Sequence, residues 1–544
     1  MKFIPIQFPE KNRLFGAYLE KSASIRPFYD RIPGDPLTDL LLQLSRRSYP
    51  RDALVSMLKT QNQGWGAESA TLDNIERLKN SHTLAVVTGQ QAGVFGGPLY
   101  TIFKVMTAIQ QSIFLNNQFP DYHFVPIFWM EVDDSDFDEI HHIQYIDKHN
   151  RLQRLELPEP ESEQGKPIFL RTLPPEITDW FHRIRDDFFD TEFKSDVLNH
   201  YARCYTPGRP YTDALACLLL SLFSSHGLIV LNPTAPEIKQ LGRPFFETLL
   251  HGGQELITAL QERNRQLQQA GFDPQVHINP RQTFLFFIDE DGRRVRIDRE
   301  DARTLLFKYP EGYRPAPREQ VLELLEKHPE RFTTNVVSRP LFQDRLLPTI
   351  IYIAGPAEVA YFAQLHSIYQ QLNIPMPVIH PRHRFTLVES KIQKILQKYQ
   401  LDYPTIFEKQ HQILKEWLQR EANAQPVIQT FLEIQQHVDR QLKTFLPALE
   451  AFDPTLIKAL QHTRASIQSN LNKFQQKLER SLQNRHQTLT RQLEKMLLHF
   501  FPQHAPQERV LNMIYFQIKY GWQFPDQLLE RMPADTLPHW IVEL

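Results

Sequence analysis

The residues best suited to chemistry form an acidic run at positions 131–139, which reads Glu-Val-Asp-Asp-Ser-Asp-Phe-Asp-Glu. Six carboxylates within nine residues repel one another unless a cation lies among them. That cation could be Mg²⁺, the ammonium group of a substrate, or Lys and Arg side chains of the protein itself. We predict Asp134, Asp136 and the nearby His142 as catalytic acid or base groups, and Asp133 as a substrate contact. A solvated loop, with Asp134 or Asp136 capping a helix, is the structural alternative.

A glycine-rich turn at residues 88–98, Thr-Gly-Gln-Gln-Ala-Gly-Val-Phe-Gly-Gly-Pro, is the second candidate. The chain has only 19 glycines, and four of them fall within nine residues here. Backbone N–H groups at the start of a helix attract phosphate or carboxylate, so we predict an anion site, with an ordinary surface loop as the alternative. The glycine spacing matches neither the dinucleotide-binding nor the Walker A pattern. The substrate-binding residues predicted here are Thr88, Gly89, Gln90, Gln91, Gly93, Gly97, Tyr100 and Lys104.

Two more polar segments follow apolar runs later in the chain. Arg339 could bind a carboxylate or phosphate through two hydrogen bonds, or could form a buried structural pair with an Asp. The basic segment 380–384 could have either a functional or a structural role, and the sequence favours neither. From these segments, and from the apolar run before residue 131, we predict further substrate-binding residues: Trp129, Asn335, Arg339, Gln343, Gly355, Glu358, Tyr361 and Arg382.

The elements that would position these residues follow from the spacing of apolar side chains. Apolar runs predict buried strands at 83–87, 124–130, 228–231, 349–353 and 377–379. The succession of strand, turn, helix and strand over 83–130 indicates a parallel sheet, whose ligands bind at the carboxyl ends of the strands. A further run at 283–288, followed by Asp-Glu-Asp-Gly, predicts a hairpin. We therefore expect the glycine-rich turn and the acidic run to form two halves of one site.

Composition divides the chain into three parts. Residues 1–389 read as an α/β core with insertions at about 145–210 and 255–330, and residues 501–544 as a segment that packs back on this core. Residues 390–500 lack glycine. Within them, apolar residues recur at helical spacing over 427–449 and 466–498, which predicts two antiparallel helices of a coiled coil.

Charge and cysteine content narrow the function classes. A net charge of −2 gives no bulk electrostatic case for binding nucleic acid or an anionic membrane. No apolar run is long enough to span a bilayer, and the first residues lack the features of a signal peptide. The two cysteines, Cys204 and Cys217, match no zinc-ligand spacing and cannot build a disulfide framework, which fits a reducing compartment. We expect a cytoplasmic enzyme without zinc.

Several segments together resemble the bacillithiol biosynthesis cysteine-adding enzyme family, BshC. The resemblance runs in order through essentially the whole chain. It rests on residues 87–93, 97–101, 128–129, 134, 136–137, 139–140, 335, 339–340, 343–344, 355–356, 358, 360–362, 381–382, 385 and 507–512. What it implies for the fold is α/β: a Rossmann-like parallel-sheet core with connecting-peptide insertions, plus an α-helical coiled-coil domain that supports a homodimer.

For function, the resemblance implies a ligase that joins cysteine to glucosaminyl-malate through a C–N (amide) bond, the last step of bacillithiol biosynthesis. By analogy with the mycothiol cysteine ligase, ATP would activate the cysteine carboxylate, and an ATP or ADP site on the coiled-coil side is a further expectation. In this scheme the 88–104 segment holds an anionic substrate or phosphate. The 133–139 carboxylates hold the cysteine ammonium or a metal, and Arg339 and Arg382 hold carboxylates.

Two positions depart from the pattern that the resemblance leads us to expect. Ser135 stands in place of a His, and Ala92 in place of a Pro. If the missing imidazole were an obligatory acid or base, His141 or His142 would have to replace it, so we favour a positioning role for it. Two other functions stay open: a nucleotide-dependent nucleotidyl- or glycosyl-transferase on the same sheet, and a dimeric scaffold without catalysis.

Overall fold

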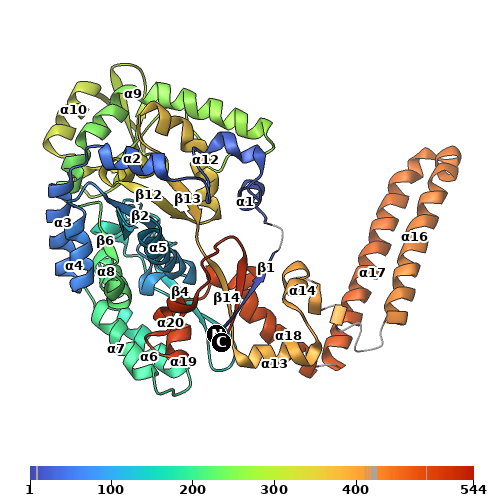
Figure 1. Ribbon diagram of the computed structural model, residues 1–544. Helices are drawn as coiled ribbons and strands as arrows, with labels where there is room; N and C mark the ends of the chain where they lie inside the picture. The colour runs from blue at the N-terminus through green and yellow to red at the C-terminus, as the bar shows by residue number, and fades with distance from the viewer. Residues whose placement is uncertain (8–9, 411, 415, 418–424, 486) are drawn as a thin grey trace. The chain divides into compact units, whose positions relative to one another are not determined.

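A computed structural model describes residues 1–7, 10–410, 412–414, 416–417, 425–485 and 487–544 (Figure 1). The chain forms two compact units. Unit 1 comprises residues 1–386 and 506–542, and unit 2 comprises residues 387–505 with 543–544. The sequence-based boundaries of the middle part, 390 and 500, compare with 387 and 505 in the structure.

The centre of unit 1 is a parallel sheet of five strands in the order β13-β12-β2-β3-β6. The apolar runs predicted as buried strands form it, which confirms the parallel sheet. The strands are β2 (Thr83–Gln90), β3 (His123–Met130), β6 (Ile229–Leu231), β12 (Thr349–Ala354) and β13 (Val378–Pro381). β2 is longer than predicted, because Thr88, Gly89 and Gln90 pair with Phe128, Trp129 and Met130 of β3 rather than forming a turn.

Helices cover both faces of this sheet. Leu84 and Val86 of β2 pack on one face with α2 (Thr38–Arg46) and α5 (Leu99–Gln118). Ala85 and Val87 belong to the larger core on the other face, with α1 (Arg13–Leu19), α3 (Arg51–Gly64), α9 (Pro236–Gln269) and α12 (Pro356–Gln371). The helices that follow β2 and β12 therefore leave these adjacent strands toward opposite faces. That divergence opens a crevice at their carboxyl ends, the usual ligand position in open parallel sheets.

The rest of unit 1 surrounds this sheet. A second, antiparallel sheet has the order β10-β9-β8-β7-β11, and the predicted turn at 289–292 joins β7 to β8, as expected for a hairpin. Its strands are β7 (Gln282–Ile288), β8 (Arg294–Arg299), β9 (Thr304–Tyr309), β10 (Gly312–Pro317) and β11 (Phe332–Thr334). The remaining elements before residue 380 are β1 (Lys2–Ile6), α4 (Ser69–Arg77), β4 (His142–Ile146), β5 (Leu152–Glu156), α6 (Ile177–Asp187), α7 (Lys194–Cys204), α8 (Tyr211–Phe223), α10 (Arg318–Lys327) and α11 (Ser338–Leu346).

After residue 506 the chain belongs to unit 1 again. This segment contains α19 (Ile514–Tyr520), α20 (Phe524–Arg531) and β15 (His539–Glu543). β15 lies between β1 and β14 (Arg384–Val388) in a small third sheet. The sequence analysis missed β1, β14 and β15, because each is short and pairs with strands far away in the chain.

Unit 2 is helical. Its described helices are α13 (Ser390–Tyr399), α14 (Tyr403–Glu408), α16 (Gln425–Phe452), α17 (Ile457–Arg485) and α18 (Gln487–Phe500). α16 and α17 lie side by side and are joined by a short turn at 453–456 (Figure 1). The rings of Phe431 and Phe474 are 5.5 Å apart across this pair, and Arg464 forms an ion pair with Asp439. The helices predicted at 427–449 and 466–498 are confirmed; the second corresponds to α17 and α18, and residue 486 lies outside the described residues.

Cys204 and Cys217 form a disulfide that joins the end of α7 to α8, with their Cα atoms 5.5 Å apart. The expectation of two thiols without a disulfide is therefore wrong, because the turn between the two helices brings residues 13 positions apart into contact. The inference from cysteine count to a reducing compartment loses its support.

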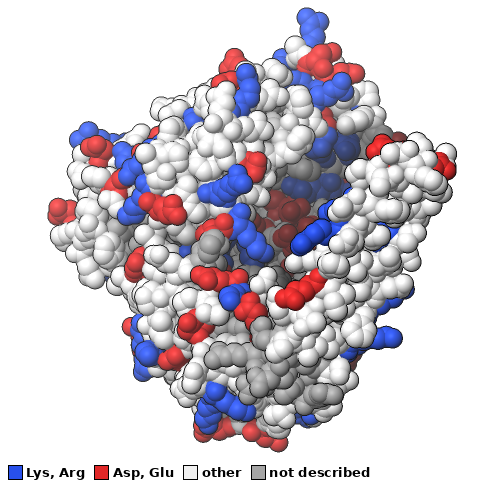
Figure 2. All heavy atoms as spheres, turned by 90° about the vertical axis from the view of Figure 1, so that its right-hand side faces the viewer, with Lys and Arg blue, Asp and Glu red and all other residues white. Residues whose placement is uncertain are grey.

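Two surface properties bear on partners. In the described part of the chain, no helix has both the length and the apolar character needed to cross a membrane. Figure 2 shows Lys and Arg interspersed with Asp and Glu over the face it presents. This mixture is unlike the continuous basic surface with which many proteins bind nucleic acid.

Candidate active site

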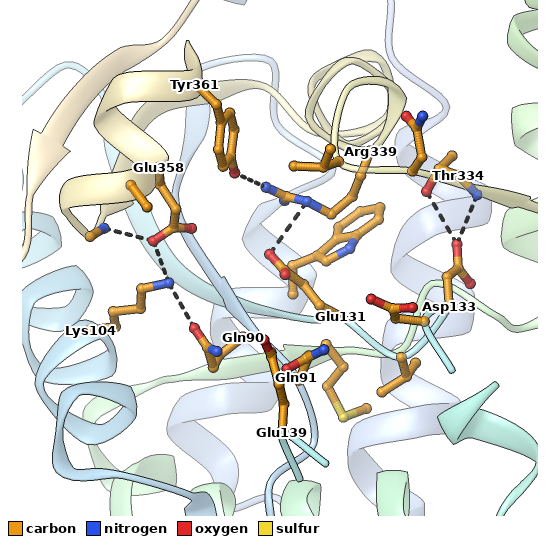
Figure 3. A pocket seen from close by; sticks show the side chains of 18 of the residues that line it. Gln90, Gln91, Lys104, Glu131, Asp133, Glu139, Thr334, Arg339, Glu358 and Tyr361 are labelled. Atoms are coloured by element: carbon orange, nitrogen blue, oxygen red, sulfur yellow. Dashed lines mark hydrogen bonds and ion pairs between the residues drawn. The ribbon is translucent and has the colours of Figure 1, made fainter. Parts of the chain in front are cut away.

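A pocket of about 430 Å³ lies at the carboxyl ends of β2, β3 and β12, where the sheet's crevice was expected (Figure 3). All of its lining residues belong to unit 1. Thirteen residues predicted as site residues line it: Gln90, Gln91, Tyr100, Lys104, Trp129, Asp133, Asp134, Asn335, Arg339, Gly355, Glu358, Tyr361 and Arg382. Residues as far apart in the chain as Gln90 and Arg382 thus converge on one site.

Lys104 and Glu358 form a buried ion pair on one wall of the pocket, with 2.5 Å between Nζ and Oε2. Lys104 also donates to the carbonyl oxygen of Gly89 at 2.7 Å and to Oε1 of Gln90 at 3.0 Å. Glu358 accepts from the Gly355 backbone N–H and from the Tyr352 hydroxyl. Burial works against the ionised form of Glu358, but Lys104 and these hydrogen bonds outweigh it and lower its pKa. The pair locks the start of α12 to α5.

Arg339 occupies the opposite wall, between Tyr361 and Glu131 in Figure 3. Its guanidinium donates to the Tyr361 hydroxyl at 2.8 Å and to Gln343 Oε1 at 3.1 Å, and its Nε lies 3.4 Å from Oε1 of Glu131. Burial disfavours its charge, but Glu131 and the surrounding oxygens prevail and raise its pKa well above the usual value. Arg339 is thus a fixed cation. Gln343, predicted as a substrate contact, lies behind it, fully buried.

Gly89 allows Glu131 to approach the end of β2. A Cβ atom at position 89 would lie 2.9 Å from Glu131 Oε1 and 3.2 Å from the Trp129 carbonyl oxygen, closer than carbon normally packs. Gly89 therefore acts through the space that it leaves, as glycine does where another group must come close.

The acidic run is neutralised mainly by the protein's own cations. Lys239, fully buried on α9, donates to both oxygens of Asp133, which also accepts from the backbone and hydroxyl of Thr334. Burial lowers the pKa of Lys239, and Asp133 opposes that effect. Arg294, on β8, lies 3.4 Å from Asp134. The cations considered for this run were Mg²⁺, a substrate ammonium, and Lys or Arg side chains of the protein. For Asp133 and Asp134, the structure shows protein side chains in this role.

Several backbone N–H groups of the glycine-rich turn, which was predicted to bind an anion, donate within the protein instead: Val94 to Ile140, Gly96 to Gly93, Gly97 to Val94 and Leu99 to Leu511. The Asn512 side chain bonds the carbonyl oxygens of Phe95 and Gly97. The C-terminal segment, distant in sequence, covers the turn. Accordingly Gly93 and Gly97 do not line the pocket, and Thr88 is buried with its hydroxyl bonded to the Ile353 carbonyl.

Arg382 was expected to hold a substrate carboxylate, and the structure gives it an internal one instead. Its two terminal nitrogens donate to the two oxygens of Glu508 at 2.7 and 2.8 Å. Both side chains are almost completely buried. Burial opposes the charge on Arg382, but Glu508 raises its pKa above the usual value. The pair anchors the C-terminal segment beside the pocket.

The two remaining catalytic candidates do not line the pocket. Asp136 lies on the exposed part of the acidic loop. His142 begins β4, where its Nδ1 contacts the Asp138 carbonyl oxygen. Burial lowers the pKa of His142, with Arg154 and His141 adding to the effect. His141 stacks on Phe137 and does not line the pocket either, so neither imidazole occupies the place expected from the missing His.

Two further charged residues line the pocket: Glu139, which was predicted only as one of the 133–139 carboxylates, and Arg509, which was not predicted as a site residue. Glu139 accepts a hydrogen bond from Gln91, and burial, then Asp136, Asp134 and Glu131, raise its pKa. Tyr100 lies near both residues. Burial, followed by the charge of Glu139, raises its pKa to about 12, so it is a neutral hydrogen-bonding group. The acidic run pointed to Glu139 only as one carboxylate among six, and no local pattern placed residue 509 beside residue 139.

Most of the described donors around this pocket are already engaged within the protein. Within the described ranges no three His, Cys, Asp or Glu side chains are grouped to hold a metal. At the two strand-to-helix turns, the N–H groups of Val94, Gly96, Gly97, Leu99 and Gly355 donate to groups of the protein itself. Lys104 has its three N–H donors directed at Gly89, Gln90 and Glu358. No step involving metal or nucleotide is assigned to these residues.

The fold and the site define a class of protein: a parallel α/β domain with a polar pocket at the carboxyl edge of its sheet, followed in the chain by a helical hairpin. Residues 1–383 match the N-terminal Rossmann-like domain described for bacillithiol biosynthesis BshC, and residues 385–544 match the C-terminal coiled-coil domain of BshC. The chain belongs to the BshC family. Both expectations from the resemblance, the family and the fold, are confirmed.

Similar proteins carry the name "Putative cysteine ligase BshC". The protein of Salinibacter ruber is 34% identical over 505 residues, which cover 92% of this chain and 90% of that protein. The Chlorobaculum tepidum protein is 32% identical, over 92% of this chain and 90% of its own length. The Anoxybacillus flavithermus protein is 29% identical over 97% of both chains. The similarity therefore extends over both units.

Proposed function

We propose that this protein is a cysteine ligase that joins the carboxyl group of cysteine to the amino group of glucosaminyl-malate and so completes bacillithiol. The observation that carries the proposal is a polar pocket at the carboxyl edge of the sheet in a chain of the BshC family. Both substrates are small and charged. The pocket offers acidic, basic and hydroxyl side chains within about 430 Å³, the size range of small-molecule sites.

The proposed reaction joins an ammonium to a carboxylate: the nitrogen gives up two protons as the C–N bond forms, and the carboxylate oxygen that is displaced leaves with the phosphate or AMP derived from ATP. This condensation is unfavourable in aqueous solution, so we include the consumption of ATP in the proposal. Most of the pocket's charged side chains are held in ion pairs with one another, and the proposal therefore assigns the pocket to binding and orienting the two substrates. Holding the amine against the carboxyl carbon lowers the entropic part of the barrier.

We also propose that the protein is a cytoplasmic homodimer joined through the hairpin of α16 and α17. Large apolar side chains on this hairpin are exposed, among them Val427 (57%), Phe474 (55%) and Phe452 (83%). Exposed apolar surface of this kind marks contact sites between proteins. Light scattering at micromolar concentration should give about twice the mass of 64.1 kDa, and Phe474→Asp should reduce it toward the single chain.

The activity is tested by incubating the purified protein with cysteine, glucosaminyl-malate and ATP, and detecting bacillithiol by mass spectrometry. The Salinibacter ruber relative is assayed in parallel. Product should require all three components. Absence of product with this chain, when the relative forms it, would overturn the proposal. Product that forms without ATP would overturn the nucleotide requirement alone.

The two alternatives give different results. A transferase on the same sheet would consume nucleotide whether or not cysteine is present. A non-catalytic scaffold would leave bacillithiol unchanged in a deletion strain, without accumulation of glucosaminyl-malate. The ligase predicts loss of bacillithiol with accumulation of that intermediate.

A further inference from the structure

The charged side chains of the pocket are not all available to a ligand. Ten charged residues line it, and eight of them are held in ion pairs of 2.5–3.4 Å. The pairs are Lys104 with Glu358, Arg339 with Glu131, Arg294 with Asp134, Asp133 with Lys239, and Arg382 with Glu508. Glu139 and Arg509 remain, and neither forms an ion pair with any described residue. The pocket thus keeps one carboxylate and one guanidinium for what it binds.

Glu139 and Arg509 both line the pocket, as does Tyr100. Both charges act on the phenol of Tyr100, in the first turn of α5, Glu139 raising its pKa and Arg509 lowering it. The Tyr100 hydroxyl also faces Gln90, whose amide lies 3.3 Å away. In Figure 3, Glu139 and Gln91 lie together below Gln90, at the end of β2. The two free charges therefore flank one hydrogen-bonding corner.

Each of the two residues is held by its neighbours. Glu508, next to Arg509, is buried in its pair with Arg382 and also accepts from the Phe385 backbone N–H. On the other side, Leu511 is buried and bonds the N–H of Leu99. Glu139 precedes the buried Ile140, whose carbonyl accepts from Val94. Both side chains are exposed, but the backbone that carries them is anchored, which reduces the entropy cost of binding.

We propose that Glu139 binds the ammonium group and Arg509 the carboxylate of a free amino acid. That this amino acid is cysteine rests on the proposed function. One leftover charge of each sign complements a zwitterion, and hydrogen bonds between charged groups are the stronger ones in proteins. Glucosaminyl-malate carries two carboxylates and one ammonium and would leave this corner unbalanced. Gln91 orients the Glu139 carboxylate, and the planar guanidinium of Arg509 can bind a carboxylate with two hydrogen bonds.

The test compares three ligands on the full-length protein by isothermal titration calorimetry: L-cysteine, 3-mercaptopropionate without the ammonium, and cysteamine without the carboxylate. Wild type should bind cysteine roughly 10- to 100-fold more tightly than either analogue. Glu139→Gln should weaken cysteine by a similar factor and leave 3-mercaptopropionate nearly unchanged. Arg509→Gln should do the same with respect to cysteamine. Glu139→Gln should thus lose the preference for cysteine over 3-mercaptopropionate and keep the preference over cysteamine. Arg509→Gln should show the reverse.

Matched controls are Asp138→Asn and Arg531→Gln, which remove an exposed charge of the same type from outside the pocket. Both should bind cysteine as wild type does. Equal affinity of wild type for cysteine and the two analogues would overturn the proposal, and this result does not depend on any variant folding. A loss in the controls equal to that in the site variants would overturn it as well.

The assay of bacillithiol formation separates this inference from the proposed function. If product forms and both site variants keep the wild-type KM for cysteine, the binding pair is wrong and the ligase stands. A rise confined to the KM for glucosaminyl-malate would also overturn the pair. If no product forms but cysteine binding depends on both residues, the pair stands and the ligase fails.

Discussion

Arg382 and Glu508, 126 residues apart, form a bidentate ion pair whose two side chains are no more than 7% exposed. The pair joins the residue after β13 to the segment that carries Arg509. The C-terminal segment is therefore part of the site.

Breaking this pair should destabilise the protein strongly. Arg382→Met or Glu508→Gln alone leaves a buried group without its partner and should lower the free energy of unfolding by about 3–5 kcal/mol. Urea denaturation followed by tryptophan fluorescence measures it. The double variant Arg382→Met with Glu508→Leu should lose less than the sum of the singles, because no charge stays buried alone. Additive losses would contradict the pairing.

A second stability prediction concerns Asp344, which is buried behind Arg339. Burial raises its pKa to about 6, against hydrogen bonds from Tyr369 and Gln343 that favour the ionised form. The folded state therefore holds this proton more tightly than the unfolded chain, whose Asp has the usual pKa. The protonated Asp344 contributes up to about 3 kcal/mol to the free energy of unfolding. This contribution is fully present below pH ~4, decreases as the pH rises toward about 6, and is lost above that pH.

The Asp344→Asn variant should lack this dependence. Its deficit relative to wild type should be largest near pH 4.5 and smaller at pH 7.5, measured as the free energy of unfolding in urea. Parallel pH curves for the two proteins would show that Asp344 does not titrate in this range.

The parts of the fold that were predicted correctly carry a recognisable pattern within their own stretch of sequence. The buried strands at 83–87 and 349–353 are uninterrupted apolar runs, and α17 has apolar residues at helical spacing. β14 and β15 lack such a signal, since each is a few residues long and is defined by strands at the other end of the chain. The order of the strands on either side of β2 depends on how distant segments of the chain pair, and no single segment of the sequence contains that information.

The sequence predicted many of the residues that line the pocket, but not the residues with which they form ion pairs and hydrogen bonds. The carboxylates of the acidic run and Arg339 do converge at one sheet edge. Their partners, however, are residues such as Lys239, which is 106 positions from Asp133 and carries no recognisable motif. In the glycine-rich turn, too, the acceptors of the Val94 and Leu99 N–H groups, Ile140 and Leu511, lie in other parts of the chain. Pairing at long range decides which polar groups stay free for a ligand.

The disulfide gives a prediction that is independent of the site. Purified protein, alkylated without reductant and analysed by mass spectrometry, should show Cys204 and Cys217 unmodified and linked. The paired substitution to Ser should lower the free energy of unfolding by roughly 3 kcal/mol, as for a closed loop of similar length. Full alkylation of both thiols in freshly isolated protein would contradict the disulfide in the native protein.

The last prediction concerns Gly89 and separates activity from stability. In Gly89→Ala the new Cβ would lie 2.9 Å from Glu131 Oε1, and the flexible carboxylate would move away from it. Arg339 would then lose an anionic partner at the pocket wall. Overpacking of this kind should cost about 1–3 kcal/mol in unfolding free energy. A displacement near 1 Å among positioning groups should lower kcat/KM by about 100-fold.

Gly252→Ala is the matched control, because a Cβ there meets nothing within 4 Å. Gly252 lies inside α9, so alanine should leave activity unchanged and raise stability by up to about 1 kcal/mol. Wild-type kcat/KM in Gly89→Ala would mean that the Glu131–Arg339 contact does not position substrate.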